Sequence, residues 1–264
     1  MARHPRSWLA ALLAILLLLN AAGAAAQESG LLSSRVFVPA VGVGAVVGCP
    51  ALPGASYAAL TVLPPPTDRP AEQHADLNLA LRGSTPTGGH LGLVDYGGPT
   101  DPDAPQLPGL FSDSRTGAFV RLHQVYDWNW SCNCRGGPLT NPAVTLAELA
   151  AVPGESLHVP DSGYTIGSGY EVLVLYAASD RITLKYTRED NVVHGFTLHL
   201  EGVCVDPPLL DLYRSWNGAG RSQLPALRPG QAFGRAAGAA IGVAIRDSGS
   251  FMDPRSRKDW WRGR

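Results

Sequence analysis

Histidine and carboxylate side chains are the residues of this chain that could bind a metal ion. Hydrolysis catalysed by a zinc ion requires three protein ligands around the metal and a fourth position left open for water. The candidate ligands are His158, Asp161, His194 and His199. An uninterrupted strand would point His194 and His199 to opposite faces, although a bulge at Gly195 would bring them together. His74 and Asp76 would share one strand face, but two residues do not complete a site. We therefore predict no metal ligand and no cofactor, with zinc as the alternative.

Carboxylate pairs are the other groups that could do chemistry. Glu189 with Asp190, and Glu201 with Asp206, have the residue type that glycosidases use at a separation of about 5 to 9 Å. Turn formation and helix capping explain the same residues. The sequence contains no Gly-x-Ser-x-Gly elbow and no phosphate-binding glycine loop. We therefore predict no catalytic residue, with a zinc-dependent or acid-base hydrolase of cell-wall polymer as the alternative.

Aromatic side chains alternate along residues 120–130. An extended strand would place Trp128 and Trp130 on the same side as Leu122, Gln124 and Tyr126. Such a stripe is typical of a sheet face packed in the core, and we expect this arrangement. The alternative is an exposed platform on which sugar rings stack, which makes Trp128 and Trp130 candidate binding residues.

The C-terminal residues 253–264 combine Trp260 and Trp261 with five cations. Cations interleaved with exposed tryptophans would suit an anionic wall polymer or a membrane surface, so Trp260 and Trp261 are a second pair of candidate binding residues. We expect instead that both indole rings pack against the last strand while the cations remain in solvent.

The N-terminus has the three parts of a secretory signal peptide. Arg3 and Arg6 precede an apolar stretch over residues 9–19, and Ala24 and Ala26 supply the small residues before a cleavage site. An apolar core of 11 residues is shorter than the roughly 18 to 20 residues of a membrane span. We predict cleavage after Ala26 and a secreted or extracytoplasmic protein without a transmembrane span, the alternative being an uncleaved anchor.

The mature chain would carry a net charge of about −3, because all 22 acidic residues but only 19 of the 21 basic residues follow Ala26 (19 minus 22). We therefore expect no nucleic-acid partner.

The four cysteines follow the predicted signal peptide and would meet an oxidising compartment, so we expect two disulfides. They are Cys49, Cys132, Cys134 and Cys204. A bridge from Cys132 to Cys134 across one residue would be strained. We therefore predict that Cys49 and Cys204 each pair with one of these two. The alternative is a metal site on residues 132–134, which lacks the spaced second pair of a zinc motif.

Glycine and proline supply 30 and 22 of the 264 residues, which predicts many turns and few long helices. Hydrophobic periodicity predicts an antiparallel meander of residues 170–176, 181–187 and 196–201, and a helix over 207–217 capped by Asp206. The other expected elements are strands over 35–47, 76–82, 120–130 and 241–245, and a short helix over 144–151.

We place the domains at 1–26 (signal peptide), 27–137 (loop-rich β region) and 138–264 (antiparallel β domain).

Part of the C-terminal region has the order of a known family. The segments are 170–177, 182–186, Pro229-Gly230-Gln231 with Phe233-Gly234, 241–246, Ser248-Gly249 and Asp253-Pro254. In this order they resemble the lysostaphin-type zinc endopeptidases, over about 95 residues. The resemblance implies a small antiparallel, barrel-like sheet and an ancestry in cutting cell-wall peptide cross-links.

The resemblance does not carry the family's zinc ligands into this chain. The family's His-x-His pair would fall on Ala240 and Gly242, and neither residue can bind zinc or move a proton. The nearest match to the earlier His-x-x-x-Asp motif is His158 with Asp161, which is one residue too short. We carry over no catalytic residue.

Together these observations predict a mostly β protein of two β-rich parts, the C-terminal one an antiparallel sheet or small barrel with one inserted short helix. We predict a secreted binding or scaffold protein of the cell envelope or extracellular space, without catalytic activity, whose partner is cell-wall glycan or peptide.

Overall fold

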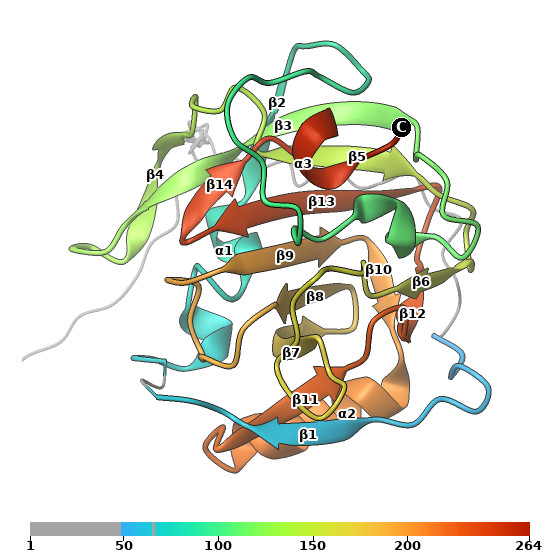
Figure 1. Cartoon of the computed structure of the whole chain (residues 1–264). Helices are drawn as coiled ribbons and strands as arrows, with labels where there is room; N and C mark the ends of the chain where they lie inside the picture. Colours follow the sequence, from blue (N-terminus) through green and yellow to red (C-terminus); the bar gives the residue numbers. More distant parts are fainter. Residues whose placement is uncertain (1–48, 65–66) are drawn as a thin grey trace, which may run out of the picture. The chain divides into compact units, whose positions relative to one another are not determined.

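The computed structural model describes residues 49–64 and 67–264 (Figure 1). The predicted signal peptide and the predicted strand over residues 35–47 lie outside these ranges. Within the described ranges, the structure contains no helix with the length and hydropathy needed to cross a membrane.

The described part of the chain is mostly β, as predicted. Its larger sheet runs in the order β1-β11-β7-β8-β9-β13-β5-β3-β2, with β14 added to β13 and β4 added to β3 (Figure 1). The bounds are β1 Ala58–Thr61, β2 Ser84–Thr87, β3 Phe119–Asn129, β4 Cys134–Pro138, β5 Leu146–Ala150, β7 Val172–Ala178, β8 Arg181–Lys185, β9 Phe196–Glu201, β11 Gln223–Leu227, β13 Ala240–Asp247 and β14 Ser250–Met252.

A smaller sheet contains β10 (Val203–Val205), β12 (Ala232–Ala236) and β6 (Ser156–His158), in that order. All pairings between the named strands of both sheets are antiparallel. The fold class predicted from hydrophobic alternation is therefore confirmed.

The larger sheet contains strands from both sides of the predicted boundary at residues 137 and 138. β1 pairs with β11, and β3 pairs with β5 through Leu122 opposite Ala147 and His123 opposite Leu146. The boundary therefore does not separate two sheets. The predicted boundary falls inside β4, Cys134–Pro138, which pairs with β3.

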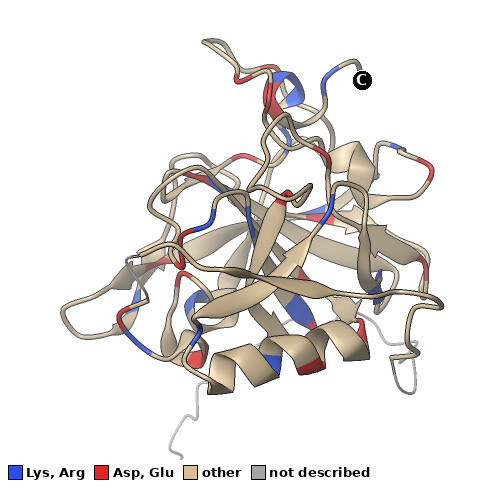
Figure 2. Ribbon diagram, turned by 60° about the horizontal axis from the view of Figure 1, so that its bottom comes forward, with Lys and Arg blue, Asp and Glu red and all other residues tan. Residues whose placement is uncertain are grey.

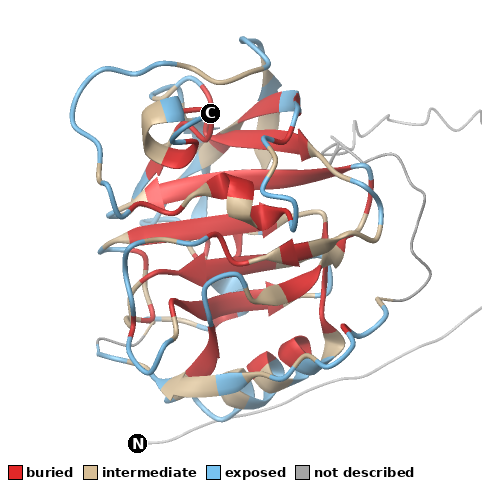
Figure 3. Cartoon of the chain, turned by 45° about the vertical axis from the view of Figure 1, so that its right-hand side comes forward, coloured by how far each residue is buried: buried red, intermediate tan, exposed pale blue. Residues whose placement is uncertain are grey.

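Alternation along β8, β9 and β13 gives the larger sheet two different faces. The predicted meander is present as β7, β8 and β9. One face packs in the main hydrophobic core, through Ile182, Leu184, Leu198, Leu200, Val243 and Ile245. The opposite face, here called the polar face, carries Thr183, Lys185, Thr197, His199, Glu201, Glu148 and Arg246. Most residues of β8, β9 and β13 are buried, on the polar face as well as on the core face (Figure 3).

The predicted helix is α2, Pro207–Gly218, with proline in its first turn and Asp206 at its N-cap. It buries Leu209, Leu210 and Tyr213 and exposes charged residues on its outer side (Figure 2). The Asp206 carboxylate makes no capping hydrogen bond. It accepts hydrogen bonds from the Leu52 amide and the Tyr57 hydroxyl instead, each at 2.7 Å.

Two local predictions are wrong. Residues 76–82, expected as a strand, form turns and the short helix α1, Leu79–Arg82. Residues 144–151, expected as a helix, contain β5, which lies hydrogen-bonded between β3 and β13. Pairing on both edges overrides the weak helical preference of this alanine- and leucine-rich segment. The remaining helices are α3 (Arg257–Trp260), η1 (Ala71–Gln73) and η2 (Leu107–Leu110).

All four cysteines form disulfides, as predicted, but the predicted pairing is wrong. Cys49 pairs with Cys204, and Cys132 pairs with Cys134. Asn133 has a φ of 50°, and the chain turns there so that the Cα atoms of Cys132 and Cys134 lie 5.2 Å apart. Asparagine tolerates this left-handed conformation better than most residues. The Cys49–Cys204 bridge ties the start of the described chain to β10.

The C-terminal tryptophans are core residues. Trp260 and Trp261 are 1% and 0% exposed. Their Nε1 atoms donate to the carbonyl oxygens of Asp253 and Pro254 at 2.9 and 2.8 Å. Because neither ring reaches the surface, Trp260 and Trp261 are not available as binding residues.

Removing the Trp261 ring should destabilise the protein. Its burial predicts that Trp261→Ala lowers the free energy of unfolding by about 3–5 kcal/mol, through lost contacts and a new cavity. Urea denaturation followed by circular dichroism measures the change. The control is Arg264→Ala, which removes an exposed side chain of the same tail. Equal unfolding midpoints for the two variants would contradict the core assignment.

Candidate functional site

An exposed aromatic platform lies at the end of the β3–β4 hairpin and consists of Trp128 and Trp130. Their ring centroids are 6.3 Å apart, with an interplanar angle of 65°. Trp128 is half-buried, while Trp130 is 41% exposed. The core packing expected for this stripe therefore does not extend to Trp130, which lies beyond the last residue of β3. The Cys132–Cys134 disulfide closes the turn that carries the platform.

Two residues from a distant segment, Arg69 and His74, lie beside Trp130. The Arg69 guanidinium lies 4.6 Å from the ring centroid of Trp130, and the His74 ring lies 5.2 Å from the same ring. Asn133 Oδ1 accepts hydrogen bonds from Arg69 Nη1 at 2.8 Å and from Trp128 Nε1 at 3.3 Å. One amide oxygen thus links the hairpin to the Arg69 segment.

The charge on the Arg69 segment is balanced locally. Asp68 pairs with Arg69 at 2.8 Å, and the Arg69 guanidinium lowers the pKa of Asp68. His74 Nε2 lies 3.4 Å from Asp68 Oδ1. Burial lowers the pKa of His74, which favours the neutral imidazole. The platform therefore has a neutral imidazole and an ion pair at its edge.

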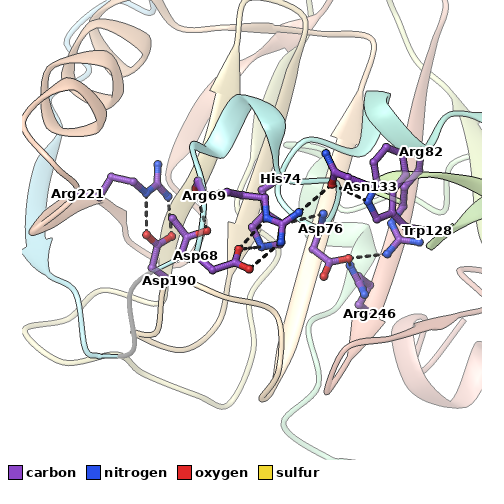
Figure 4. Close-up of polar contacts among 11 residues, drawn as sticks. Asp68, Arg69, His74, Asp76, Arg82, Trp128, Asn133, Asp190, Arg221 and Arg246 are labelled. Carbon is purple, nitrogen blue, oxygen red and sulfur yellow. Dashed lines mark hydrogen bonds and ion pairs between the residues drawn. The ribbon is translucent and has the colours of Figure 1, made fainter. Parts of the chain in front are cut away.

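Asp76 connects this segment to the polar face of the sheet (Figure 4). Its Oδ1 atom accepts hydrogen bonds from Arg82 Nη2 at 2.7 Å and from Arg246 Nη1 at 2.6 Å. Burial by itself would raise the pKa of Asp76, but Arg246 and Arg82 outweigh it and lower the pKa to about 2. Asp76 is therefore an ionised anchor held by two arginines. Its Oδ1 atom already accepts both hydrogen bonds and is not free to bind a ligand.

The four candidate metal ligands do not converge. His158 lies on β6 in the smaller sheet, Asp161 and His194 lie exposed on separate loops, and His199 is buried on β9. His199 Nδ1 and Thr183 Oγ1 are 3.0 Å apart, and burial lowers the pKa of His199 to about 3. Across residues 49–64 and 67–264, no three His, Cys, Asp or Glu side chains are grouped so that they could hold a metal ion.

Two glutamates flank Gly242 on the polar face. Gly242 on β13 lies opposite Glu201 on β9 and opposite Glu148 on β5. Glu148 Oε1 is 2.9 Å from His123 Nε2. Glu201 Oε2 accepts a hydrogen bond from Arg181 Nε at 2.9 Å.

The two glutamates have different surroundings. Glu148 is 6% exposed and also lies 3.4 Å from Arg121 Nη1. Burial raises the pKa of Glu201 to about 7, and the nearby Arg181 only partly opposes this effect. Carboxylates held in contrasting surroundings are a recurring feature of acid-base sites.

Sequence reasoning missed most of these neighbours. The sequence suggests Glu201 and Asp206 as a carboxylate pair, but the Asp206 carboxylate accepts hydrogen bonds from the Leu52 amide and the Tyr57 hydroxyl. Glu148 lies on β5, and no sequence pattern singles it out or pairs it with Glu201. Arg69 lies 61 residues before Trp130 in the chain (130 minus 69), and no local pattern connects them.

Comparison with known proteins identified no relative. No family model, curated protein or solved structure matches this chain.

The raised pKa of Glu201 predicts a pH-dependent stability. Its folded value of about 7 lies above the ordinary value of 4.5, so the folded state binds this proton more tightly than the unfolded state. The stabilising contribution is complete below about pH 4.5 and is lost as the pH rises through about 7. As the pH rises from about 5 to about 8, the free energy of unfolding of Glu201→Gln should therefore increase relative to that of the wild type.

Urea midpoints measured across this pH range test the effect. Asp211→Asn, which alters an exposed side chain on α2, is the control and should keep a constant difference from the wild type. If the Glu201→Gln curve runs parallel to that of the wild type, Glu201 does not titrate in this way.

Proposed function

We propose that this protein is a secreted, non-catalytic binding protein of the cell envelope, and that its Trp128–Trp130 platform holds the sugar rings of wall glycan. The observation that carries the proposal is the 41% exposure of Trp130 beside a second indole ring. The predicted signal peptide and the two disulfides support a location outside the cytoplasm.

The chemistry of the platform matches that of a sugar. An indole face offers a flat apolar surface, and stacking on it removes the apolar face of a sugar ring from water. The ring hydroxyls then need hydrogen-bond partners at the edge. Asp68, which is largely exposed, can accept such bonds, and Arg69 can donate them. Because the disulfide and Asn133 hold the turn, little conformational entropy is lost when a glycan binds.

Truncating Trp130 tests the proposal. We expect Trp130→Ala to bind an N-acetylglucosamine tetramer about tenfold more weakly than the wild type, which corresponds to about 1.4 kcal/mol of stacking free energy. Isothermal titration calorimetry gives the affinity, and sedimentation with insoluble peptidoglycan gives a second readout. Leu91→Ala, at a residue that is 55% exposed, is the matched control. Wild-type protein that binds neither probe would refute the proposal.

A second candidate function is acid-base hydrolysis of wall polymer, which the placement of Glu148 and Glu201 on either side of Gly242 favours. Two strand spacings separate their Cα atoms by about 10 Å, and side chains that lean over a glycine can approach the separation used by glycosidases. Glu201, with its pKa of about 7, would act as the acid. Glu148, held by His123 and Arg121, would act as the base or nucleophile.

This candidate predicts that the wild type releases reducing ends from peptidoglycan. Glu148→Gln and Glu201→Gln should each lower the rate by at least about 100-fold. A chelator should leave the rate unchanged, because the chemistry needs no metal. Wild-type protein that binds glycan without turnover would eliminate this candidate and leave the binding function intact.

A further inference from the structure

A cavity of about 690 Å³ lies between the segment 52–58 and the turn that joins β11 to β12. Its volume falls within the roughly 300–1,000 Å³ of small-molecule sites. The side chains used in the following argument are Tyr57, Tyr170, Arg228, Gln231 and Arg235, all of which line it. The cavity shares no lining residue with the Trp128–Trp130 platform, so an inference about it is independent of the proposed function.

Two arginines give the cavity its charge. Within the described ranges, neither Arg228 nor Arg235 has a carboxylate within ion-pair distance. Arg228 lies 4.4 Å from the ring centroid of Tyr170 and donates through Nη1 to Gly169 O at 3.1 Å. Arg235 donates through Nη1 to Gly154 O at 2.9 Å, while its buried Nε has no partner. Both guanidinium groups thus carry uncompensated charge and unused donors.

The segment 52–58, which lines the cavity, is held in place before any ligand binds. Tyr57 donates to Asp206 at 2.7 Å, and Leu52 is bound to the same carboxylate. Gln231 Nε2 donates to Ser56 O at 3.0 Å, and the Cys49–Cys204 disulfide fixes the start of the segment. A preformed wall reduces the entropy lost on binding.

From these contacts we infer that the cavity binds a small ligand through an oxyanion group, a carboxylate or a phosphate, held between Arg228 and Arg235. A guanidinium group matches the geometry of such oxygens and binds them with charge-assisted hydrogen bonds. Leu52 and Pro229, which also line the cavity, provide apolar contact for the rest of the ligand.

The test is calorimetric titration of the full mature chain with three probes, at low salt. The first is N-acetyl-alanyl-alanine with a free carboxylate, the second is its C-terminal amide, and the third is inorganic phosphate. We expect binding of the free acid or of phosphate and no binding of the amide. Saturation by the free acid alone would identify the carboxylate as the ligand group, whereas saturation by phosphate alone would identify a phosphate.

Arginine variants connect any binding to this cavity. We expect Arg228→Gln and Arg235→Gln each to weaken binding about tenfold or more. Arg214→Gln, on the outer side of α2 with 63% of its side chain exposed, should bind like the wild type. Arg228 is exposed and bonded to loop carbonyls, so its variant stays informative if Arg235→Gln fails to fold. No binding of either anion, equal binding of the amide, or unchanged affinity in Arg228→Gln would overturn the inference.

Discussion

The carboxylate of Asp76 is the group on which the polar side of the sheet depends. Without it, Arg246 would be a buried cation with no described carboxylate in ion-pair distance, and Arg82 would keep only Asp127, an exposed residue at 3.7 Å. An unpaired buried charge is strongly destabilising. With it, the chain around α1 is fixed against β13, and Thr183 adds a hydrogen bond to the carbonyl oxygen of Leu77 at 2.7 Å. A sheet face with so many polar residues can therefore be covered by protein.

The Asp76 anchor also helps to position the residues beside the aromatic platform. Arg69 and His74 precede Asp76 on the same segment, so fixing Asp76 places them beside the β3–β4 hairpin. The Asn133 amide then joins the two pieces from the hairpin side. A surface feature made from remote segments is thus supported by an ion pair in the interior, which gives it the rigidity that binding sites require.

The sheet position that the family resemblance would assign to zinc ligands has different chemistry in this chain. Ala240 and Gly242 lie on β13, where Gly242 pairs with Glu148 on one side and with Glu201 on the other. The Glu201 side chain packs over Gly242, where an added Cβ would lie 3.2 Å from Glu201 Cβ. Glu148 lies beside His123 and Arg121, and Glu201 lies beside Arg181, all from neighbouring strands. The cavity on the other sheet has the opposite character, with cations from β12 and its preceding turn that no described carboxylate neutralises.

Local pattern by itself determined the meander, the helix after Asp206 and the mostly β character, because alternation and helical spacing describe which side of each element is apolar. It also determined that the cysteines are oxidised. Packing of Trp260 and Trp261 in the core was also expected from the sequence. Only the tertiary structure decided the cysteine pairing, the strand β5 in place of a helix, and the contact of Arg69 with Trp130. The Cys132–Cys134 bridge depends on a local turn at Asn133. The other features depend on strand order and on contacts between residues far apart in the chain, which leave no periodic signal in either partner.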